Sequence, residues 1–168
     1  LNSNFNIVLK YNDESFTIYG MDECRFYLSS NAGYDLQPLD KIVSGGEMSR
    51  IMLAIKLAFQ EKDLVSSLIF DEIDTGISGK IAEKVGLSME ELSISQQVIC
   101  ITHLSQIASK GKCHVKIYKH EVDGKVKVKV KSLDIKERVR EIASLISGEL
   151  ITESGYVQAK TLLSWWIN

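Results

Sequence analysis

The sequence has little proline and little cysteine, and it lacks any long apolar run. One proline and three cysteines (Cys24, Cys100 and Cys113) occur among 168 residues. An odd number of cysteines without a Cys-x-x-Cys pair favours neither a disulfide framework nor a zinc site, and it favours a reducing cytosol. No apolar run approaches the ~18 residues of a membrane-spanning helix, and no signal-peptide pattern is visible.

The sequence also lacks a strong excess of one charge. Lys and Arg number 20, and Asp and Glu number 22, for a formal net charge of −2. This balance argues against a uniformly basic nucleic-acid-binding protein, although not against a local basic patch. The composition is near the globular average, and the length suits one domain or one domain with a small lobe. Because the chain begins at Leu1 rather than Met, we expect a segment of a longer protein.

Hydrophobic periodicity predicts short strands followed by alternating helices and strands. Residues 5–9, 16–19 and 25–28 are strand-like, and residues 47–60 have the spacing of a helix that is apolar almost all round and therefore buried. The runs at 68–70 and 97–102 predict strands buried on both faces, with a helix over 81–92 between them. This order favours a parallel sheet.

The last third of the chain predicts a hairpin and two helices. Strands at 113–118 and 125–131 flank an Asp123-Gly124 turn. Helices follow at 134–146 and 152–166, the first with Asp134 as N-cap and Glu137 three residues later. The terminal pair Trp165-Trp166 is expected to pack on the domain or on an absent lobe.

A glycine pair opens the helix predicted at 47–60, in the sequence Ser44-Gly45-Gly46-Glu47. Glycines allow a ligand to approach the backbone closely, and a helix start offers free N–H groups to a phosphate. The alternative is a simple capping box, in which Ser44 bonds forward and Glu47 bonds back. On spacing alone the capping box is favoured, and the two interpretations are compatible.

Two adjacent carboxylates, Asp71 and Glu72, follow the strand at 68–70. Ligands of open α/β folds bind at the carboxyl ends of parallel strands. One carboxylate there can hold Mg²⁺ and the other can deprotonate an attacking water. The alternative is a solvated acidic turn. His103 follows the next strand and would share this edge if the two strands are neighbours, although a lone histidine is more often structural.

Taken in order, these stretches resemble the motifs of one ATPase class. Residues 44–47 resemble the signature motif of ABC-type ATPases in the Glu-ended form of the SMC class. Residues 68–72 resemble their Walker B motif, residues 73–79 their D-loop, and residues 101–104 their switch-histidine loop. Within this class the chain is similar to the RecN family of bacterial SMC-like DNA repair ATPases over about residues 31–163. Ser78, where many ABC proteins carry Asp, agrees with that family.

The resemblance implies an α/β fold, the C-terminal lobe of an ABC/SMC-type P-loop ATPase head, with a partly parallel sheet flanked by helices and an added β-hairpin. It implies one lobe in three stretches: a β-rich lead-in (1–36), a motif-bearing core (37–111), and the hairpin with the C-terminal helices (112–168). The implied activity is ATP hydrolysis at a head dimer, in DNA double-strand break repair and recombination. The implied location is the bacterial cytoplasm, at the nucleoid.

The resemblance also implies residue roles. Asp71 binds Mg²⁺, Glu72 is the catalytic base, and His103 senses the γ-phosphate of ATP. The signature residues clamp the γ-phosphate of a nucleotide held by a second subunit: Ser44, Gly45, Gly46 and Glu47. The D-loop residues contact that subunit across the dimer: Asp74, Thr75, Gly76 and Ser78.

The sequence contains no GxxxxGK[ST] phosphate loop and no heptad stretch of coiled-coil length. The resemblance places both in preceding segments of the whole protein. We therefore expect the partners to be an N-terminal Walker A segment, a second head in an ATP-dependent homodimer, and DNA through the full-length protein, but no membrane. Alone, the chain should bind ATP poorly and not hydrolyse it. The alternatives are the head of another SMC- or ABC-type ATPase, and a non-catalytic partner-binding module.

Four lysines alternate with three valines from Lys125 to Lys131. In a strand this pattern places the lysines on one face and the valines on the other. The basic face can contact DNA phosphates. The favoured alternative is a solvated sheet edge, whose lysines discourage edge-to-edge aggregation.

Overall fold

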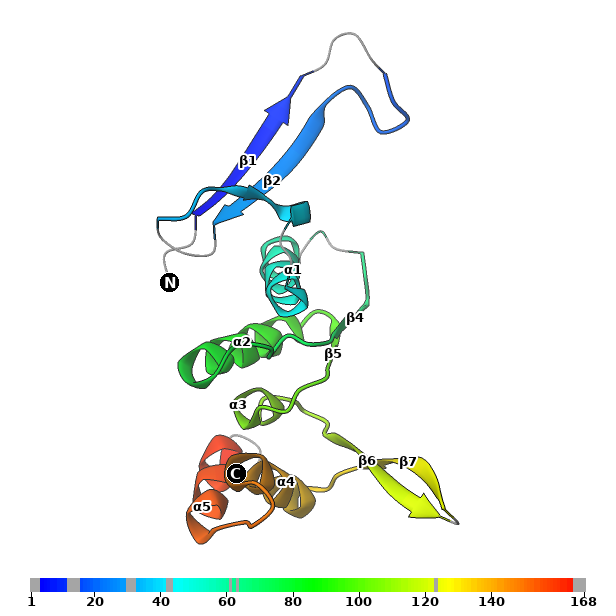
Figure 1. The fold of residues 1–168 in the computed structure, drawn as a ribbon, viewed down its shortest axis with the longest axis vertical. Coiled ribbons are helices and arrows are strands. Elements are labelled where there is room, and N and C mark those ends of the chain that lie inside the picture. Colours follow the sequence, from blue (N-terminus) through cyan, green and yellow to red (C-terminus); the bar gives the residue numbers. More distant parts are fainter. Residues whose placement is uncertain are drawn as a thin grey trace. The chain divides into compact units, whose positions relative to one another are not determined.

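The computed structural model describes residues 4–11, 16–29, 33–41, 44–60, 62, 64–122 and 124–164. The chain divides into two compact units, residues 1–44 and residues 45–168 (Figure 1), whereas the sequence predicts one lobe in three stretches. None of the described helices is both long and apolar enough to cross a membrane.

The first unit is a small antiparallel sheet. β1 (Asn4–Lys10) pairs with β2 (Glu23–Ser29), which pairs at its end with β3 (Gln37–Pro38), and the 3-10 helix η1 (Leu39–Lys41) follows. The register places Ile7 opposite Phe26 on one apolar face. On that face Phe5 stacks on Phe26 with ring centroids 5.8 Å apart. The strands predicted at 5–9 and 25–28 are confirmed.

The strand predicted at 16–19 is wrong. Thr17 and Gly20 instead close a tight turn, in which each backbone N–H donates to the other residue's carbonyl oxygen at 3.0 and 3.1 Å. Gly20 has φ +110°, a conformation that glycine adopts easily. Aromatic and β-branched composition favours a strand here, but the turn leaves the segment no strand to pair with.

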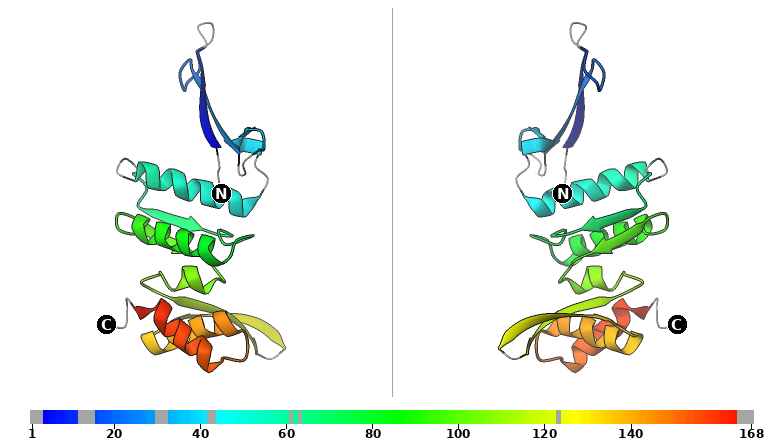
Figure 2. Two further views of the ribbon diagram at one scale, coloured as in Figure 1. Left: turned by 90° about the vertical axis from the view of Figure 1, so that its left-hand side faces the viewer. Right: turned by 90° about the vertical axis from the view of Figure 1, so that its right-hand side faces the viewer.

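The second unit contains α1 (Gly45–Phe59), β4 (Ser67–Phe70), α2 (Gly79–Leu92), β5 (Gln97–Cys100) and α3 (Ser105–Ala108). β4 and β5 pair in parallel, from Ser67 opposite Gln97 to Phe70 opposite Cys100. Helices α1 and α2 lie on one side of these strands (Figures 1 and 2). The predicted strand–helix–strand unit and its parallel sheet are confirmed.

The core of this sheet lies on the helix side. It joins Leu53 of α1 and four residues of α2 to Phe70, Ile73 and Ile107; the α2 residues are Ala82, Val85, Met89 and Leu92. The other side is open, since Ile69 is 69% exposed and its register partner Ile99 is 44% exposed. The prediction that both strands are buried on both faces is therefore wrong. A two-stranded sheet with helices on one side leaves every second side chain uncovered.

Helix α1 is also less buried than its composition predicts. Among its residues only Gly46 and Leu53 are buried, while Met52 is 40% exposed and Phe59 is 57% exposed. The predicted helix itself is confirmed. Its buried residues pack on the β4–β5 sheet and α2, and the described part of residues 45–168 leaves the apolar side chains of Met52 and Phe59 largely uncovered.

The hairpin β6 (Val115–Val122) and β7 (Lys125–Ser132) precedes α4 (Ile135–Ser147) and α5 (Glu153–Leu162). The hairpin is confirmed, although Asp123 of its turn lies outside the described residues. Arg138 of α4 donates to the carbonyl oxygens of Gly111 (2.6 Å) and Lys112 (3.1 Å), and so fastens α4 to the segment before β6.

The predicted capping box of α4 is confirmed. Glu137 N donates to Asp134 Oδ1 at 2.8 Å, and Asp134 N donates to Glu137 Oε2 at 3.2 Å. Helix α4 packs on α5 around a second core of Ile142, Ala143, Ala159 and Leu163. Helix α5 ends at Leu162, earlier than predicted, and Trp165 and Trp166 lie outside the described residues.

Replacing Leu92 with Ala should lower the free energy of unfolding by about 2–5 kcal/mol, because Leu92 is fully buried and the change leaves a cavity. Leu87→Ala is the matched control, since Leu87 lies on the same helix and is 47% exposed. Urea denaturation followed by circular dichroism measures both. Equal losses in the two variants would contradict the described core.

Candidate functional site

The loop after β4 carries two exposed carboxylates, Asp71 and Glu72. The N–H of Glu72 donates to Asp71 Oδ1 at 2.8 Å. Glu72 has φ +56°, the only positive φ among the described residues other than glycine. Non-glycine residues in this region carry backbone strain, which is held only where the surroundings impose it.

The first turns of α1 impose this loop conformation. The hydroxyl of Ser49 donates to the carbonyl oxygen of Asp71 at 2.9 Å. The guanidinium of Arg50 donates to the carbonyl oxygens of Ile73 (3.0 Å) and Thr75 (2.9 Å). Sequence reasoning assigned no role to Ser49 or Arg50, because these bonds exist only once the start of α1 lies against the end of β4.

The glycines of the signature-like motif lie against the same loop. A Cβ added to Gly46 would be 2.9 Å from the carbonyl oxygen of Glu72 and 3.0 Å from that of Thr75. A Cβ added to Gly45 would meet only the flexible end of Glu72, with Oε2 at 2.6 Å. At Gly46, the space left by the missing Cβ is therefore occupied by backbone carbonyl oxygens of the chain itself. Ser44 is exposed, and its capping bond with Glu47 stays a prediction.

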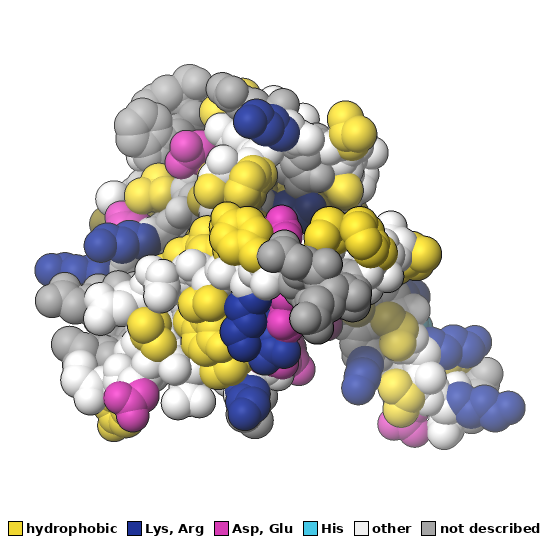
Figure 3. Space-filling model, turned by 90° about the horizontal axis from the view of Figure 1, so that it is seen from above, with side chains coloured by type: hydrophobic (Ala, Val, Ile, Leu, Met, Phe, Trp, Pro, Cys, Tyr) yellow, Lys and Arg dark blue, Asp and Glu magenta, His cyan; other side chains and the backbone are white. Residues whose placement is uncertain are grey.

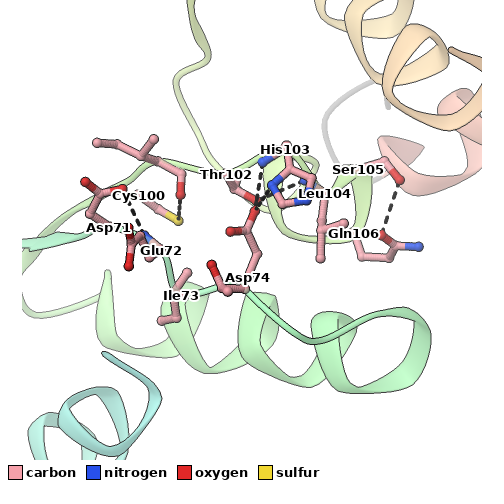
Figure 4. A network of polar contacts seen from close by, with 12 residues as sticks. Asp71, Glu72, Ile73, Asp74, Cys100, Thr102, His103, Leu104, Ser105 and Gln106 are labelled. Atoms are coloured by element: carbon pink, nitrogen blue, oxygen red, sulfur yellow. Dashed lines mark hydrogen bonds and ion pairs between the residues drawn. The ribbon is translucent and has the colours of Figure 1, made fainter. Parts of the chain in front are cut away.

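Asp74 is the best-connected carboxylate of the described chain, and its side chain is buried. Its Oδ2 accepts the hydroxyl of Thr102 at 2.6 Å and the backbone N–H of His103 at 2.8 Å. The imidazole Nδ1 of His103 lies 2.9 Å from the same oxygen. Thr102 Oγ1 in turn accepts the N–H of Leu104 at 3.1 Å. Asp74 therefore joins the D-loop-like segment to residues 102–104 of the switch-histidine-like loop (Figure 4).

These contacts keep Asp74 ionised. Burial acts to raise the pKa of its carboxyl, but hydrogen bonds from Thr102 and the backbone of His103, with the charge of the imidazole, outweigh burial and leave the pKa lowered. The Cys100 thiol, close to this carboxylate, has a raised pKa. Burial is the main cause, and the negative charges of Asp74 and Asp71 add to it, so that the pKa is about 12. Cys100 is therefore neutral at physiological pH.

The structure places the carboxylates and the histidine at one sheet edge but does not pair all of them. Asp71, Glu72 and His103 follow parallel strands and so lie beyond the same end of the sheet, as the sequence predicts. Figure 4 shows Asp71 and Glu72 on one side of Ile73 and the Asp74–His103 pair on the other. The His103 side chain is 73% exposed and meets Asp74 alone among these carboxylates. The remaining residues of the D-loop-like segment that the sequence singled out, Thr75, Gly76 and Ser78, are exposed.

The residues at this edge fit a magnesium ion that is shared with phosphates. Among the described residues no group of three His, Cys, Asp or Glu side chains could hold a metal ion by itself. Magnesium commonly takes one or two protein carboxylates and completes its shell with water and phosphate oxygens. Asp71 is exposed and uses Oδ1 for the N–H of Glu72. Asp71 thus matches a single-carboxylate site and not an ion held by protein alone.

The β6–β7 hairpin exposes both of its faces. On the lysine face, Lys116 pairs with Glu141 and Lys131 with Glu137, which turns the base of that face toward α4. The hairpin extends beyond the helices, with blue lysines and yellow apolar side chains both visible on it (Figure 3). Its opposite face has five apolar residues that are 51–68% exposed: Val115, Ile117, Val126, Val128 and Val130.

Comparison with known proteins finds no matching family model. The chain is 46% identical to the DNA repair protein RecN of Halalkalibacterium halodurans over 144 residues, which cover 86% of the chain and 26% of that protein. It is 44% identical to RecN of Rickettsia typhi over 162 residues, which cover 96% of the chain and 29% of that protein. It is also 44% identical to RecN of Bacillus subtilis over 147 residues, which cover 88% of the chain and 26% of that protein. The chain thus spans a little over a quarter of the length of these curated relatives.

Solved structures show the fold. The Smc head domain of Pyrococcus yayanosii, solved with a coiled coil and joint, is similar with a TM-score of 0.61 and 23% identity. The match covers 83% of the present chain and 25% of the Pyrococcus chain. A structure from a study of ATP-driven dimerization of SMC ATPases is similar with a TM-score of 0.55 and 20% identity. The match covers 88% of the present chain and 84% of the chain in that structure. The α/β fold expected for a lobe of an SMC-type head is confirmed.

Gly46→Ala should displace the loop at 72–75, because its Cβ would overlap two backbone carbonyl oxygens that cannot rotate away. We expect a loss of about 1–3 kcal/mol in the free energy of unfolding, and changed amide chemical shifts at Glu72 and Thr75. Gly45→Ala is the control, since it meets only a movable carboxylate. Unchanged shifts in Gly46→Ala would refute the described packing.

Proposed function

We propose that this chain, which belongs to the RecN family, is the C-terminal half of an ATP-hydrolysing head in a protein that acts in DNA double-strand break repair. The observation that carries the proposal is the single sheet edge at which Asp71, Glu72 and His103 follow parallel strands. Sequence similarity to RecN proteins and the SMC-head fold support it.

The proposal gives each residue at this edge a role that suits its position. Exposed Asp71 would hold Mg²⁺, which when bound neutralises charge on the nucleotide phosphates. Glu72, the next residue, would accept a proton from the attacking water. His103, exposed and supported by Asp74, would contact the γ-phosphate. Catalysis of this kind depends on positioning and charge, which strained and braced loops can provide.

The second half of the head would come from the N-terminal Walker A segment of the same protein. The sequence has no phosphate loop, and the sheet face opposite the helices exposes Ile69 (69%), Ile99 (44%) and Ile101 (53%). Burying one such side chain contributes about 1.5–3 kcal/mol. An apolar surface of this kind suits a covering protein layer.

A second head would complete the site from the other side. The signature residues Ser44, Gly45, Gly46 and Glu47 would contact the γ-phosphate of a nucleotide held by that head. Of the D-loop residues, exposed Thr75, Gly76 and Ser78 would face the partner. Engagement of the two heads would thus depend on ATP. The complete protein would act on DNA at the bacterial nucleoid, in the cytoplasm.

The chain alone should show no ATP turnover, and adding the N-terminal Walker A segment should restore it. In the restored head, Glu72→Gln should lower kcat by at least about a hundredfold and retain bound ATP, because the amide cannot accept the proton. Phosphate release and nucleotide retention measure the two effects.

Glu83→Gln is the matched control, since Glu83 is an exposed glutamate of α2. Wild-type turnover in Glu72→Gln would favour the alternative of a non-catalytic partner-binding module. Turnover by the chain alone would contradict the half-head proposal.

Substitutions on the lysine face of the hairpin test whether this face contributes to DNA binding by the complete protein. Lys116 and Lys131 are paired with α4, which supports a structural role, so we expect Lys127→Glu with Lys129→Glu to leave the DNA affinity of the full-length protein unchanged. Titrations at several salt concentrations measure this, with Lys80→Glu and Lys84→Glu on α2 as control. A log–log salt slope smaller by about 2 would instead assign two phosphate contacts to the hairpin.

A further inference from the structure

The side chain of Asp74 points into the protein. It is only 4% exposed. One of its oxygens, Oδ2, receives the Thr102 hydroxyl, the His103 backbone N–H and the His103 imidazole, at 2.6, 2.8 and 2.9 Å. Its neighbour Ile73 is fully buried and anchors the segment from the other side. This arrangement differs from the dimer contact that the D-loop resemblance implies for Asp74.

We propose that Asp74 is a positioning residue for His103: its carboxylate accepts Nδ1–H and so directs Nε2 toward the nucleotide phosphate, which Nε2 contacts as a donor when the ring carries both protons. This inference rests on the proposed ATPase function, because it assigns the orientation of a residue of that site. Asp74 itself does not touch the nucleotide.

The chemistry of the three contacts carries the inference. An ionised carboxylate only accepts hydrogen bonds, so the imidazole nitrogen facing it must carry a proton. The other nitrogen, Nε2, does not face Asp74, and the side chain that carries it is 73% exposed. The hydrogen bond made by one ring nitrogen decides what the other can do. The ring is thereby presented to the sheet edge in one tautomer and one orientation.

The backbone of the switch-histidine loop is held by the same group. Asp74 accepts the N–H of His103, and it accepts the hydroxyl of Thr102, which in turn accepts the N–H of Leu104. A shift of the D-loop would therefore move three consecutive residues of the switch loop together. Sequence reasoning missed this link because Asp74 and Thr102 are 28 residues apart.

Asp74→Asn tests the proposal, because it keeps the size of the side chain and removes its charge. The asparagine amide can donate as well as accept, so it no longer requires a proton on Nδ1. Asp134→Asn is the matched control: it makes the same change at the N-cap of α4, where Asn caps about as well as Asp. Imidazole ¹⁵N chemical shifts of the labelled 168-residue chain report the tautomer of His103 directly.

We expect the Nδ1–H form in the original chain and in Asp134→Asn, and a shift toward Nε2–H in Asp74→Asn. In the complete protein, Asp74→Asn should lower kcat for ATP by about tenfold to a hundredfold, with KM changed less than twofold. An unchanged tautomer, or an unchanged kcat in a turnover-competent protein, overturns the positioning role. Absence of turnover in the unmutated complete protein overturns the proposed function instead, while the tautomer still decides the orientation.

Discussion

The parallel pairing of β4 with β5 is the constraint on which the rest of the second unit depends. Four register pairs, from Ser67–Gln97 to Phe70–Cys100, align the two strand ends. Because α2 crosses between them on one side, the loops that carry the acidic pair and the histidine both emerge at the same edge. The hydrogen bonds from Ser49, Arg50 and Thr102 then decide the detailed shape of those loops.

The unit is one-sided. Its helices bury the inner side chains of the sheet, while isoleucines on the outer side and valines on the hairpin remain exposed. Since burial of each such side chain is worth about 1.5–3 kcal/mol, the open surface represents several kcal/mol available to a covering layer. This asymmetry and the matched length, a little over a quarter of the RecN relatives, both suit half of a larger head.

The three acidic side chains of the loop are treated differently by the fold. Asp71 and Glu72 stay exposed, where a metal ion or water can reach them, and Glu72 is held at a positive φ by the bracing of α1. Asp74 is buried, a position that is costly for a charge unless hydrogen bonds compensate. Three donors supply that compensation, and they make Asp74 a connector between loops.

The elements and the location of the site were largely predictable from the sequence. Hydrophobic spacing is local, so it predicted α1, β4, α2, β5 and the hairpin, and the Asp134–Glu137 capping box followed from residues three apart. The prediction of a strand at 16–19 was wrong because a strand needs a partner strand, and composition does not reveal whether one is present. The prediction of burial was wrong at Ile69 and along α1 for a related reason, since periodicity identifies an apolar face but not the element that covers it.

The sequence by itself determined which residues we propose to carry the chemistry: the glycine pair, the acidic pair and the histidine, each recognisable within a few positions. Only the tertiary structure decided how they are held. The contacts of Arg50 with Ile73 and Thr75, and of Asp74 with Thr102 and His103, join residues 23 to 29 positions apart. Such pairs meet only after the helix and the two strands have packed, because hydrogen bonds depend on distance in space and not on separation along the chain.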